Sequence, residues 1–228
     1  MIASVQIADV RVRTALATLR KAPPTGTPGL RWAMVALAAP LRSQVLPAPP
    51  SLKRIALLSF WDDDAALDRW FAADAPAAFH GGWSSRLEPL RAFGSWPGLD
   101  AEVPAARRVD YDGPAVVFTL GRLRLSQGLR FLRTSAPAEA AVLAAPGCIW
   151  ATGLGRPPYV ATCSLWEGYD AINKYAFADK SAAHPRAIAA DARKGFHHQE
   201  AFIRFRPYAA TGALTGKNAL SEHSLATN

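Results

Sequence analysis

A stretch of twenty residues occurs twice in this chain, 105 positions apart. Residues 55–74 read IALLSFWDDDAALDRWFAAD, and residues 160–179 read VATCSLWEGYDAINKYAFAD. Six of the twenty aligned positions are identical, including the Ser and Trp of a Ser-x-Trp motif at 59–61 and 164–166. A repeat of this length indicates one folding unit that is used twice, so it constrains the fold more than any other feature.

Each copy has the pattern of a strand that leads into an amphipathic helix. A short apolar run ends in Trp, an acidic residue follows, and apolar residues then recur at i, i+3 and i+4. These residues are Leu67, Trp70 and Phe71 in the first copy and Ile172, Tyr175 and Ala176 in the second. The run Asp62–Asp64 marks a helix start, where carboxylates interact favourably with the helix N-terminus.

The segments around the repeat complete two similar halves. Pro-Gly and Trp-Ala pairs precede each copy, at 28–33 and at 146–151. In the second half we expect strands at Ala115–Gly121, Cys148–Leu154, Tyr159–Trp166 and Gln199–Arg206. We expect helices at Gln127–Ala145, interrupted near Pro137, at Tyr169–Ala178, and from His184-Pro185 onward. This is the β-α-β-β-α-β order of the split β-α-β plan.

The sequence therefore predicts an α+β chain made of two tandem ferredoxin-like β-α-β-β-α-β halves. The halves span residues 1–96 and 115–210, with a linker rich in Pro, Gly and Asp at 97–114 and a flexible tail at 211–228. We expect their two sheets to pack as an intrachain pseudo-dimeric α+β barrel that encloses an apolar space. The alternative is a duplicated scaffold without a pocket, since a fold does not establish a function.

From the composition we expect a cytoplasmic protein. Half of its 228 residues are hydrophobic, enough for a substantial core, yet no apolar run reaches the length of a membrane span. The N-terminus lacks the pattern of a signal peptide. Cys148 and Cys163 lie in neighbouring expected strands and are interpreted as buried free thiols, because neither has a second Cys or His at ligand spacing.

The net charge of +8 comes mainly from arginine. No basic run carries the interleaved aromatic residues of a nucleic-acid motif, so we expect no nucleic-acid partner. The charge indicates solubility and some attraction to anionic membrane surfaces, which leaves peripheral membrane contact open.

Few residues point to chemistry on their own. The chain has no Gly-rich phosphate loop, Cys-x-x-Cys, His-Glu-x-x-His or Gly-x-Ser-x-Gly motif. Its five histidines are His80, His184, His197, His198 and His223. A single His such as His184, placed before an expected helix, is more commonly a capping or core residue than a ligand. The residues by themselves indicate a duplicated α+β protein with an apolar cavity.

The segment Phe177–Arg206 resembles the C-terminal region of the spheroidene monooxygenases, a family of bacterial carotenoid oxygenases. The matching features, at matching spacing, are Ala183-His184, Ala187-Ile188, Glu200 and Arg204-Phe205-Arg206. The strand ends with Ser-x-Trp are similar as well. The family is similar to the dimeric α+β barrel group, which agrees with the duplication.

This resemblance implies a haem-dependent monooxygenase that inserts oxygen at the end of an acyclic carotenoid. It implies haem b with its iron, dioxygen as co-substrate and an electron donor such as ferredoxin, and it leaves a homodimer open. His184 is the family-matched candidate for the iron ligand. Arg204 and Arg206 share one strand face and are candidates for the haem propionates, unless that face is an ordinary solvated one. No catalytic residue is assigned, and Trp61, Trp150 and Trp166 are expected in the core or the pocket wall.

Two other classes remain open. The chain could be a cofactor-free barrel oxygenase or isomerase of small aromatic polyketides, with His184 or His80 as acid and base. It could also be a non-enzymatic haem-binding or lipid-binding protein. The loops before Ser51 and around His80 differ from the family, and substrate-gating segments are expected there.

Overall fold

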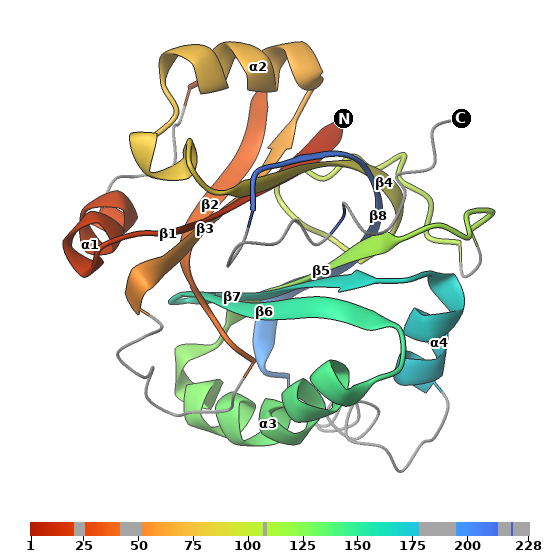
Figure 1. The fold of residues 1–228 in the computed structure, drawn as a ribbon. Coiled ribbons are helices and arrows are strands. Elements are labelled where there is room, and N and C mark those ends of the chain that lie inside the picture. The colour runs from red at the N-terminus through yellow and green to blue at the C-terminus, as the bar shows by residue number, and fades with distance from the viewer. Residues whose placement is uncertain (21–25, 42–51, 107–108, 178–194, 214–219, 221–228) are drawn as a thin grey trace.

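The computed structural model describes residues 1–20, 26–41, 52–106, 109–177, 195–213 and 220 (Figure 1). The first half contains β1 (Ile2–Asp9), α1 (Val12–Arg20), β2 (Leu30–Ala39), β3 (Arg54–Trp61), α2 (Asp64–Ala73), the short helix η2 (Ala77–Phe79) and β4 (Trp83–Gly94). The second half contains β5 (Ala115–Leu123), η3 (Leu125–Gln127), α3 (Gly128–Ala144), β6 (Cys148–Arg156), β7 (Tyr159–Trp166), α4 (Tyr169–Phe177) and β8 (His197–Thr211).

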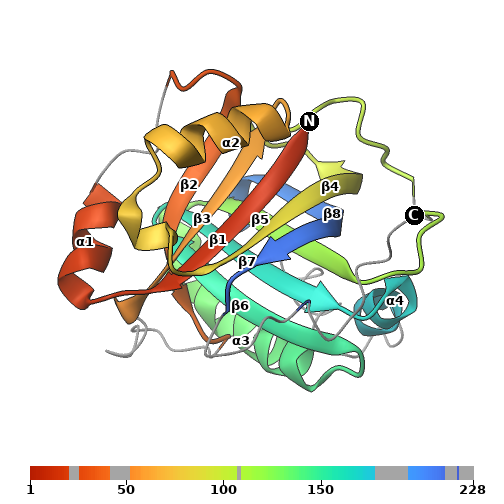
Figure 2. The same ribbon diagram turned by 45° about the horizontal axis from the view of Figure 1, so that its top comes forward.

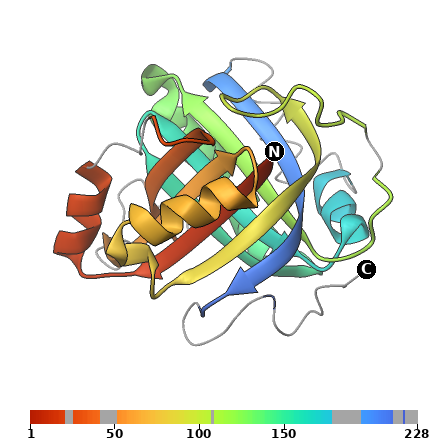
Figure 3. The ribbon, with the colours of Figure 1, turned by 90° about the horizontal axis from the view of Figure 1, so that it is seen from above.

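The eight strands form one closed barrel in the order β1-β3-β2-β6-β7-β5-β8-β4 (Figure 3). Each half contributes four consecutive strands in the ferredoxin-like order, β4-β1-β3-β2 and β8-β5-β7-β6. The halves are joined along two seams, where β4 pairs with β8 and β2 pairs with β6. The predicted fold class, an α+β barrel built from two similar halves of one chain, is confirmed.

The two copies of the sequence repeat have the same local structure. The indole Nε1 of Trp61 donates to Ser59 Oγ at 2.8 Å, and Trp166 donates to Ser164 at the same distance. A register shift also occurs at the same place in both halves, after Leu30 in β2 and after Cys148 in β6. The strand–helix units are thus equivalent in hydrogen bonding as well as in sequence.

The two Pro-Gly pairs serve the same turn. Gly29 and Gly147 both have φ near +80°, and a Cβ at either position would collide with Ala66 or Ala171 at the start of the following helix. Their carbonyl groups accept hydrogen bonds from the backbone N–H of Asp62 and Glu167, at 2.8 and 2.9 Å. Glycine is required here because only it combines this backbone conformation with so close a contact.

The barrel interior is filled by side chains. Alternate residues of every strand point inward and form one buried cluster, with Phe60, Phe118 and Phe205 among its largest members. The apolar space that we expected between the two sheets is therefore occupied, because aromatic and aliphatic side chains from opposite strands meet at the centre. Within the described residues, a cavity lies on the other face of the sheet.

The helices cover the outside of the barrel. Figure 2 shows α2 lying over the strands of the first half, with α3 on the opposite side of the barrel and α4 at one end. Asp63 caps α2 by accepting a hydrogen bond from Ala66 N–H at 2.8 Å, as expected for the acidic run. None of the described helices is long and apolar enough to cross a membrane.

Several predictions made from the sequence differ from the structure, and one falls on residues that the structure does not describe. The helix α3 continues through Pro137 because its buried residues Ala138 and Val142 follow the proline and hold the last turns against the barrel. The last strand extends on both sides of its expected bounds, and Leu220, within the predicted tail, is buried against the interior cluster. Cys163 is a buried free thiol and Cys148 a half-buried one. The expected helix from His184-Pro185 lies outside the described residues.

Candidate functional site

A cavity of about 440 Å³ lies between the second-half sheet and the helices α3 and α4. Its floor is the outward face of the sheet, because inward-facing residues such as Ile203 and Phe205 alternate with outward-facing ones along each strand. Its walls come from α3 and α4. The strands contribute Arg91, Phe93, Val117, Thr119, Thr162, Ser164, Trp166, His197, Glu200, Phe202 and Arg204, and Phe196 lies just before β8.

The lining of the cavity changes in character along β8. Arg204 lies near one end and Glu200 near the other, with the apolar ring of Phe202 between them on the same face. Four residues of extended strand separate the two charged groups by ~13 Å. The middle of the cavity is lined mainly by aromatic and aliphatic side chains, so it suits a long apolar ligand with a polar end group.

Arg204 is buried and its charge is not balanced by a carboxylate among the described residues. It is 7 % exposed, and its Nη1 atom has no hydrogen-bond partner in the described part of the chain. Its Nη2 donates to Asn173 Oδ1 at 3.2 Å, and its guanidinium lies 4.8 Å from the ring centre of Tyr169. Burial and the nearby Arg91 lower the pKa of Arg204 to about 10, so the group is still charged at neutral pH.

A second buried arginine lies directly across the seam. Arg91 of β4 pairs with Arg204 of β8 in the sheet, is 5 % exposed and lies 4.4 Å from the ring centre of Phe93. Like charges at facing sheet positions are destabilising. Burial lowers the pKa of Arg91 as well. The hydrogen bond with Asn173 and the two guanidinium groups lower the pKa of Tyr169, which lies beside them on α4.

The opposite end of the cavity carries an imidazole and a carboxylate, and a further carboxylate, Glu139, lines the cavity from α3. His197 lies 3.3 Å from Glu200 (Nδ1 to Oε2) and 5.4 Å from the Phe131 ring, measured between ring centres. Burial raises the pKa of Glu139 on α3, against the opposing effect of a hydrogen bond with Ser135. Because Gly121 has no side chain, the His197 ring can lie directly against β5.

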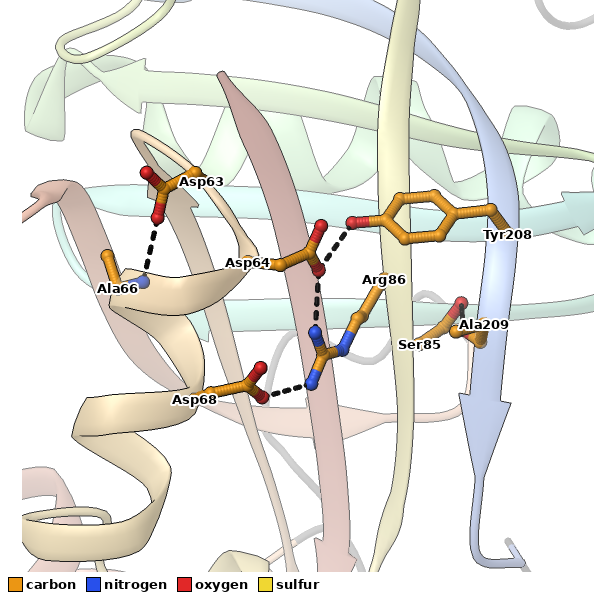
Figure 4. Close-up of polar contacts among 8 residues, drawn as sticks. All are labelled: Asp63, Asp64, Ala66, Asp68, Ser85, Arg86, Tyr208 and Ala209. Carbon is orange, nitrogen blue, oxygen red and sulfur yellow. Dashed lines mark hydrogen bonds and ion pairs between the residues drawn. The ribbon is translucent and has the colours of Figure 1, made fainter.

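The same place in the first half holds an ion-pair cluster (Figure 4). Arg86 of β4 bridges two carboxylates of α2: Nη1 lies 2.6 Å from Asp64 Oδ1, and Nη2 contacts Asp68. The Tyr208 hydroxyl donates to Asp64 at 2.8 Å. The hydrogen bond to Asp68 is the main factor that raises the pKa of Arg86. The charge of Arg86 is therefore fully balanced within the chain.

Strand register identifies Arg86 and Arg204 as equivalent residues. Arg86 pairs with Ser4, which pairs with Ser59, and Arg204 pairs with Val117, which pairs with Ser164. Since Ser59 and Ser164 are identical positions of the repeat, the two arginines occupy the same site in each half.

The helix residues that face these arginines differ in charge. At the 105-residue offset, Asp64 aligns with Tyr169 and Asp68 aligns with Asn173. The second half thus has an arginine at the equivalent position, but neutral side chains, Tyr169 and Asn173, at the positions of the two carboxylates.

The structure places the residues selected from the sequence in different surroundings. Arg204 lines the cavity, whereas Arg206 lies further along the same face, ion-paired with Glu88 at 2.6 Å. Both point away from the barrel interior. His184 lies outside the described residues, and so does His223. His80 is exposed beside Phe71 in the first half.

The predicted role of the tryptophans is confirmed in part by position. Trp61 and Trp166 are buried, and Trp166 also lines the cavity. Trp150 is half-buried against the interior cluster, 5.9 Å from Trp83 between ring centres.

Sequence reasoning missed Arg91, Tyr169 and the cavity position of His197. The signal for Tyr169 was present in the repeat, where it replaces an aspartate. Arg91 has no such signal, because it joins the site only through the pairing of β4 with β8. Among the described residues, no group of three or more His, Cys, Asp or Glu side chains is arranged to hold a metal ion. A haem iron, by contrast, needs one axial side chain.

Two proteins of known name are similar in sequence to this chain. It is 31% identical to a spheroidene monooxygenase from Rubrivivax gelatinosus over 175 residues, which cover 74% of this chain and 66% of that protein. It is 27% identical to a spheroidene monooxygenase from Rhodobacter capsulatus over 142 residues, covering 61% of this chain and 58% of that protein. The resemblance seen in the sequence is confirmed, and the matches span only about two thirds or less of these relatives.

Solved structures give a weaker match. A putative monooxygenase from Lactobacillus acidophilus NCFM has a TM-score of 0.40 at 10% identity, covering 93% of this chain and 97% of that one. An anthrone oxidase-like protein has a TM-score of 0.37 at 13% identity, covering 95% and 94%. At these scores neither structure indicates what this chain does. No family model matches the chain.

Proposed function

We propose, from its sequence similarity to spheroidene monooxygenases, that this chain is a haem-dependent monooxygenase of hydrophobic substrates. The proposed substrate is the end of an acyclic carotenoid, with dioxygen as co-substrate and a ferredoxin-like protein as electron donor. The observation that carries the proposal is the mainly apolar cavity of the second half, found in a chain with this sequence similarity.

The cavity supports a substrate that enters by one end. Its volume of about 440 Å³ lies in the usual range for small-molecule sites but is too small for a cofactor together with a whole carotenoid. Phe93, Phe202 and Trp166 form apolar walls that would exclude water and orient a polyene terminus. Most of a long substrate would then remain outside the cavity.

One group that lines the cavity, Arg204, supports haem as the proposed cofactor. The unpaired Nη1 of Arg204 suits an anionic substituent, and we propose Arg204, with Arg206 further along the same face, for the propionates. We propose His184 as the axial ligand of the iron. When bound, haem supplies the iron centre that activates dioxygen.

The repeat supports His184 for this role. Continued beyond residue 179, the 105-residue offset aligns Ala77-Ala78-Phe79 with Ala182-Ala183-His184. In the first half, Phe79 is 2 % exposed and packs between the sheet and α2. The alignment therefore makes His184 the sequence counterpart of this buried first-half residue. His197 is the second candidate, because it is the cavity-lining histidine of the described residues.

An absorption titration tests the proposal. Addition of haem to the purified full chain should produce a Soret band at one haem per chain. His184→Ala should abolish or shift that band, while His198→Ala and His80→Ala, at exposed positions, serve as matched controls. Loss of the band in His197→Ala with retention in His184→Ala would transfer the ligand role to His197. Absence of a band in the wild-type protein would refute haem binding and favour a cofactor-free enzyme.

Turnover is a separate question from haem binding. The haem-loaded protein, supplied with a reduced ferredoxin and dioxygen, should convert an acyclic carotenoid to a product with one added oxygen atom at its end. Mass spectrometry with labelled dioxygen measures this directly. A haem-loaded protein that leaves the carotenoid unchanged would refute the substrate assignment and leave the haem assignment intact.

A further inference from the structure

The most informative feature outside the proposed iron site is the pair of buried arginines at one end of the cavity. An isolated buried charge is costly, and proteins normally balance it with an opposite charge. The equivalent arginine of the first half, Arg86, obeys this rule through Asp64 and Asp68. Within the described part of the chain Arg204 has no such partner, although it is more deeply buried than Arg86.

We propose that Arg91 and Arg204 form a binding site for a carboxylate group of the cavity's ligand. The ligand carboxylate would take the place that the two aspartates of α2 hold in the first half. It would accept a hydrogen bond from Nη1 of Arg204, which lacks an acceptor among the described residues. Arg91 contributes a second positive charge from across the seam between the two halves.

The geometry favours a carboxylate at this end of the cavity. An arginine presents a planar fork of donors that matches the two oxygens of a carboxylate. Tyr169 and Asn173 replace the aspartates with neutral polar side chains, so the helix adds polar contacts without adding a competing negative charge. The apolar stretch beyond Arg204 then suits the hydrophobic body of an amphiphilic acid.

Two sources of such a carboxylate are compatible with the site. One is a propionate of haem, in which case the inference rests on the proposed function and extends it to Arg91 and Tyr169. The other is an organic acid with a long apolar chain. Both present the same chemical group, and matched pairs of charged and uncharged probes separate them.

The test uses the full chain with haem and haem dimethyl ester, and with dodecanoate and dodecanol. If the carboxylate belongs to haem, the wild-type protein should bind haem about ten- to a hundredfold more tightly than its dimethyl ester, as for other hydrogen bonds to charged groups. If it belongs to an organic acid, the same preference should appear for dodecanoate over dodecanol. In either case Arg204→Gln and Arg91→Gln should remove the preference.

The repeat supplies a second variant that does not depend on removing an arginine. Asn173→Asp restores the carboxylate that Asp68 provides in the first half. It should raise the Tm of the ligand-free protein by about 2–4 °C and weaken binding of the charged probe, because the arginine then has an internal partner. Asp68→Asn is the matched control and should lower the Tm without changing probe binding.

The outcomes separate this inference from the haem assignment. Absence of a Soret band together with a preference for dodecanoate would refute haem binding and support the carboxylate site. Equal affinity for charged and uncharged probes of both pairs would overturn the carboxylate site. So would a preference that persists in Arg204→Gln and in Asn173→Asp.

Discussion

The two halves of the barrel differ most in the layer between sheet and helices. In the first half this layer is closed, with Trp70, Phe79 and Leu67 buried against the strands. In the second half the same layer contains a cavity of about 440 Å³. The strands, the Ser-x-Trp hydrogen bonds and the Pro-Gly turns are common to both. The two halves are therefore alike in the barrel strands and differ in the packing between the sheet and its helices.

A few aligned substitutions account for the difference. At the 105-residue offset, Trp70 becomes Tyr175 and Phe71 becomes Ala176, which removes aromatic volume from the helix face. Asp64 and Asp68 become Tyr169 and Asn173, which removes the partners of the arginine. One copy of the unit is thus packed and charge-balanced, and the other leaves space and positive charge for a ligand.

We expect the largest difference in unfolding free energy between the halves when the aligned aromatic residues Trp70 and Tyr175 are replaced by alanine. Trp70→Ala should cost about 3–5 kcal/mol of unfolding free energy, because the indole is fully buried against Trp61. Tyr175→Ala should cost less, about 1–3 kcal/mol, since its ring already borders a cavity. Urea unfolding of both variants measures the difference. Equal losses would mean that the second half is as tightly packed as the first.

Removal of the Ser-x-Trp hydrogen bond should destabilise the protein by a similar amount in either half. Ser59→Ala and Ser164→Ala each leave a buried indole N–H without its acceptor and should cost about 1–3 kcal/mol. Ser59 also bonds to Ser4 at 2.7 Å, so its loss should be slightly greater. The same urea experiment checks this. A neutral Ser164→Ala would contradict the equivalence of the two units.

Transfer of a first-half residue into the second half should close the cavity. Ala176→Phe copies Phe71 and should stabilise the ligand-free protein by about 0.5–2 kcal/mol, because cavity filling adds apolar contacts. It should also weaken haem binding in the absorption titration. Phe71→Ala, the reverse change in the first half, is the control and should lower stability without changing that binding. Unchanged haem affinity in Ala176→Phe would place the ligand elsewhere.

The smallest expected difference between the halves is in the pKa values of two tyrosines, Tyr169 and Tyr208. Asn173 and the two arginines lower the pKa of Tyr169, whereas burial and the hydrogen bond to Asp64 raise the pKa of Tyr208. On raising the pH, Tyr169 should therefore lose its proton before Tyr208. Ultraviolet difference titration of Tyr169→Phe and Tyr208→Phe, each compared with the wild type, resolves the order. The reverse order would mean that the surroundings of Arg86 and Arg204 differ in charge less than their side chains indicate.

The elements of the fold could be predicted because they depend on local patterns. The 20-residue repeat, its switch from an apolar run to helical spacing, and the Pro-Gly turns give the strand–helix units and their duplication. The course of α3 through Pro137 could not be predicted, because the packing that holds it is contributed by distant parts of the chain. The same holds for the packed barrel interior, which is formed by residues from all eight strands.

The candidate site was only partly accessible from the sequence. Arg204 was identified through the family resemblance, but its role as a buried, unbalanced charge depends on which face of β8 meets the helices. Arg91 could not be identified, because β4 and β8 lie far apart in the chain. The replacements at Tyr169 and Asn173 were visible in the repeat. Their meaning appears only when register shows that Arg86 and Arg204 are equivalent.

A crystal structure of the full chain reconstituted with haem tests the central claim most directly. The account predicts haem in the second-half cavity, between the outward face of β5 and β8 and the helices α3 and α4, with its carboxylate groups against Arg204 and Arg91. The corresponding layer of the first half should remain closed by Trp70 and Phe79. Haem bound in the first half or on the barrel surface, with the second-half cavity empty, would contradict it.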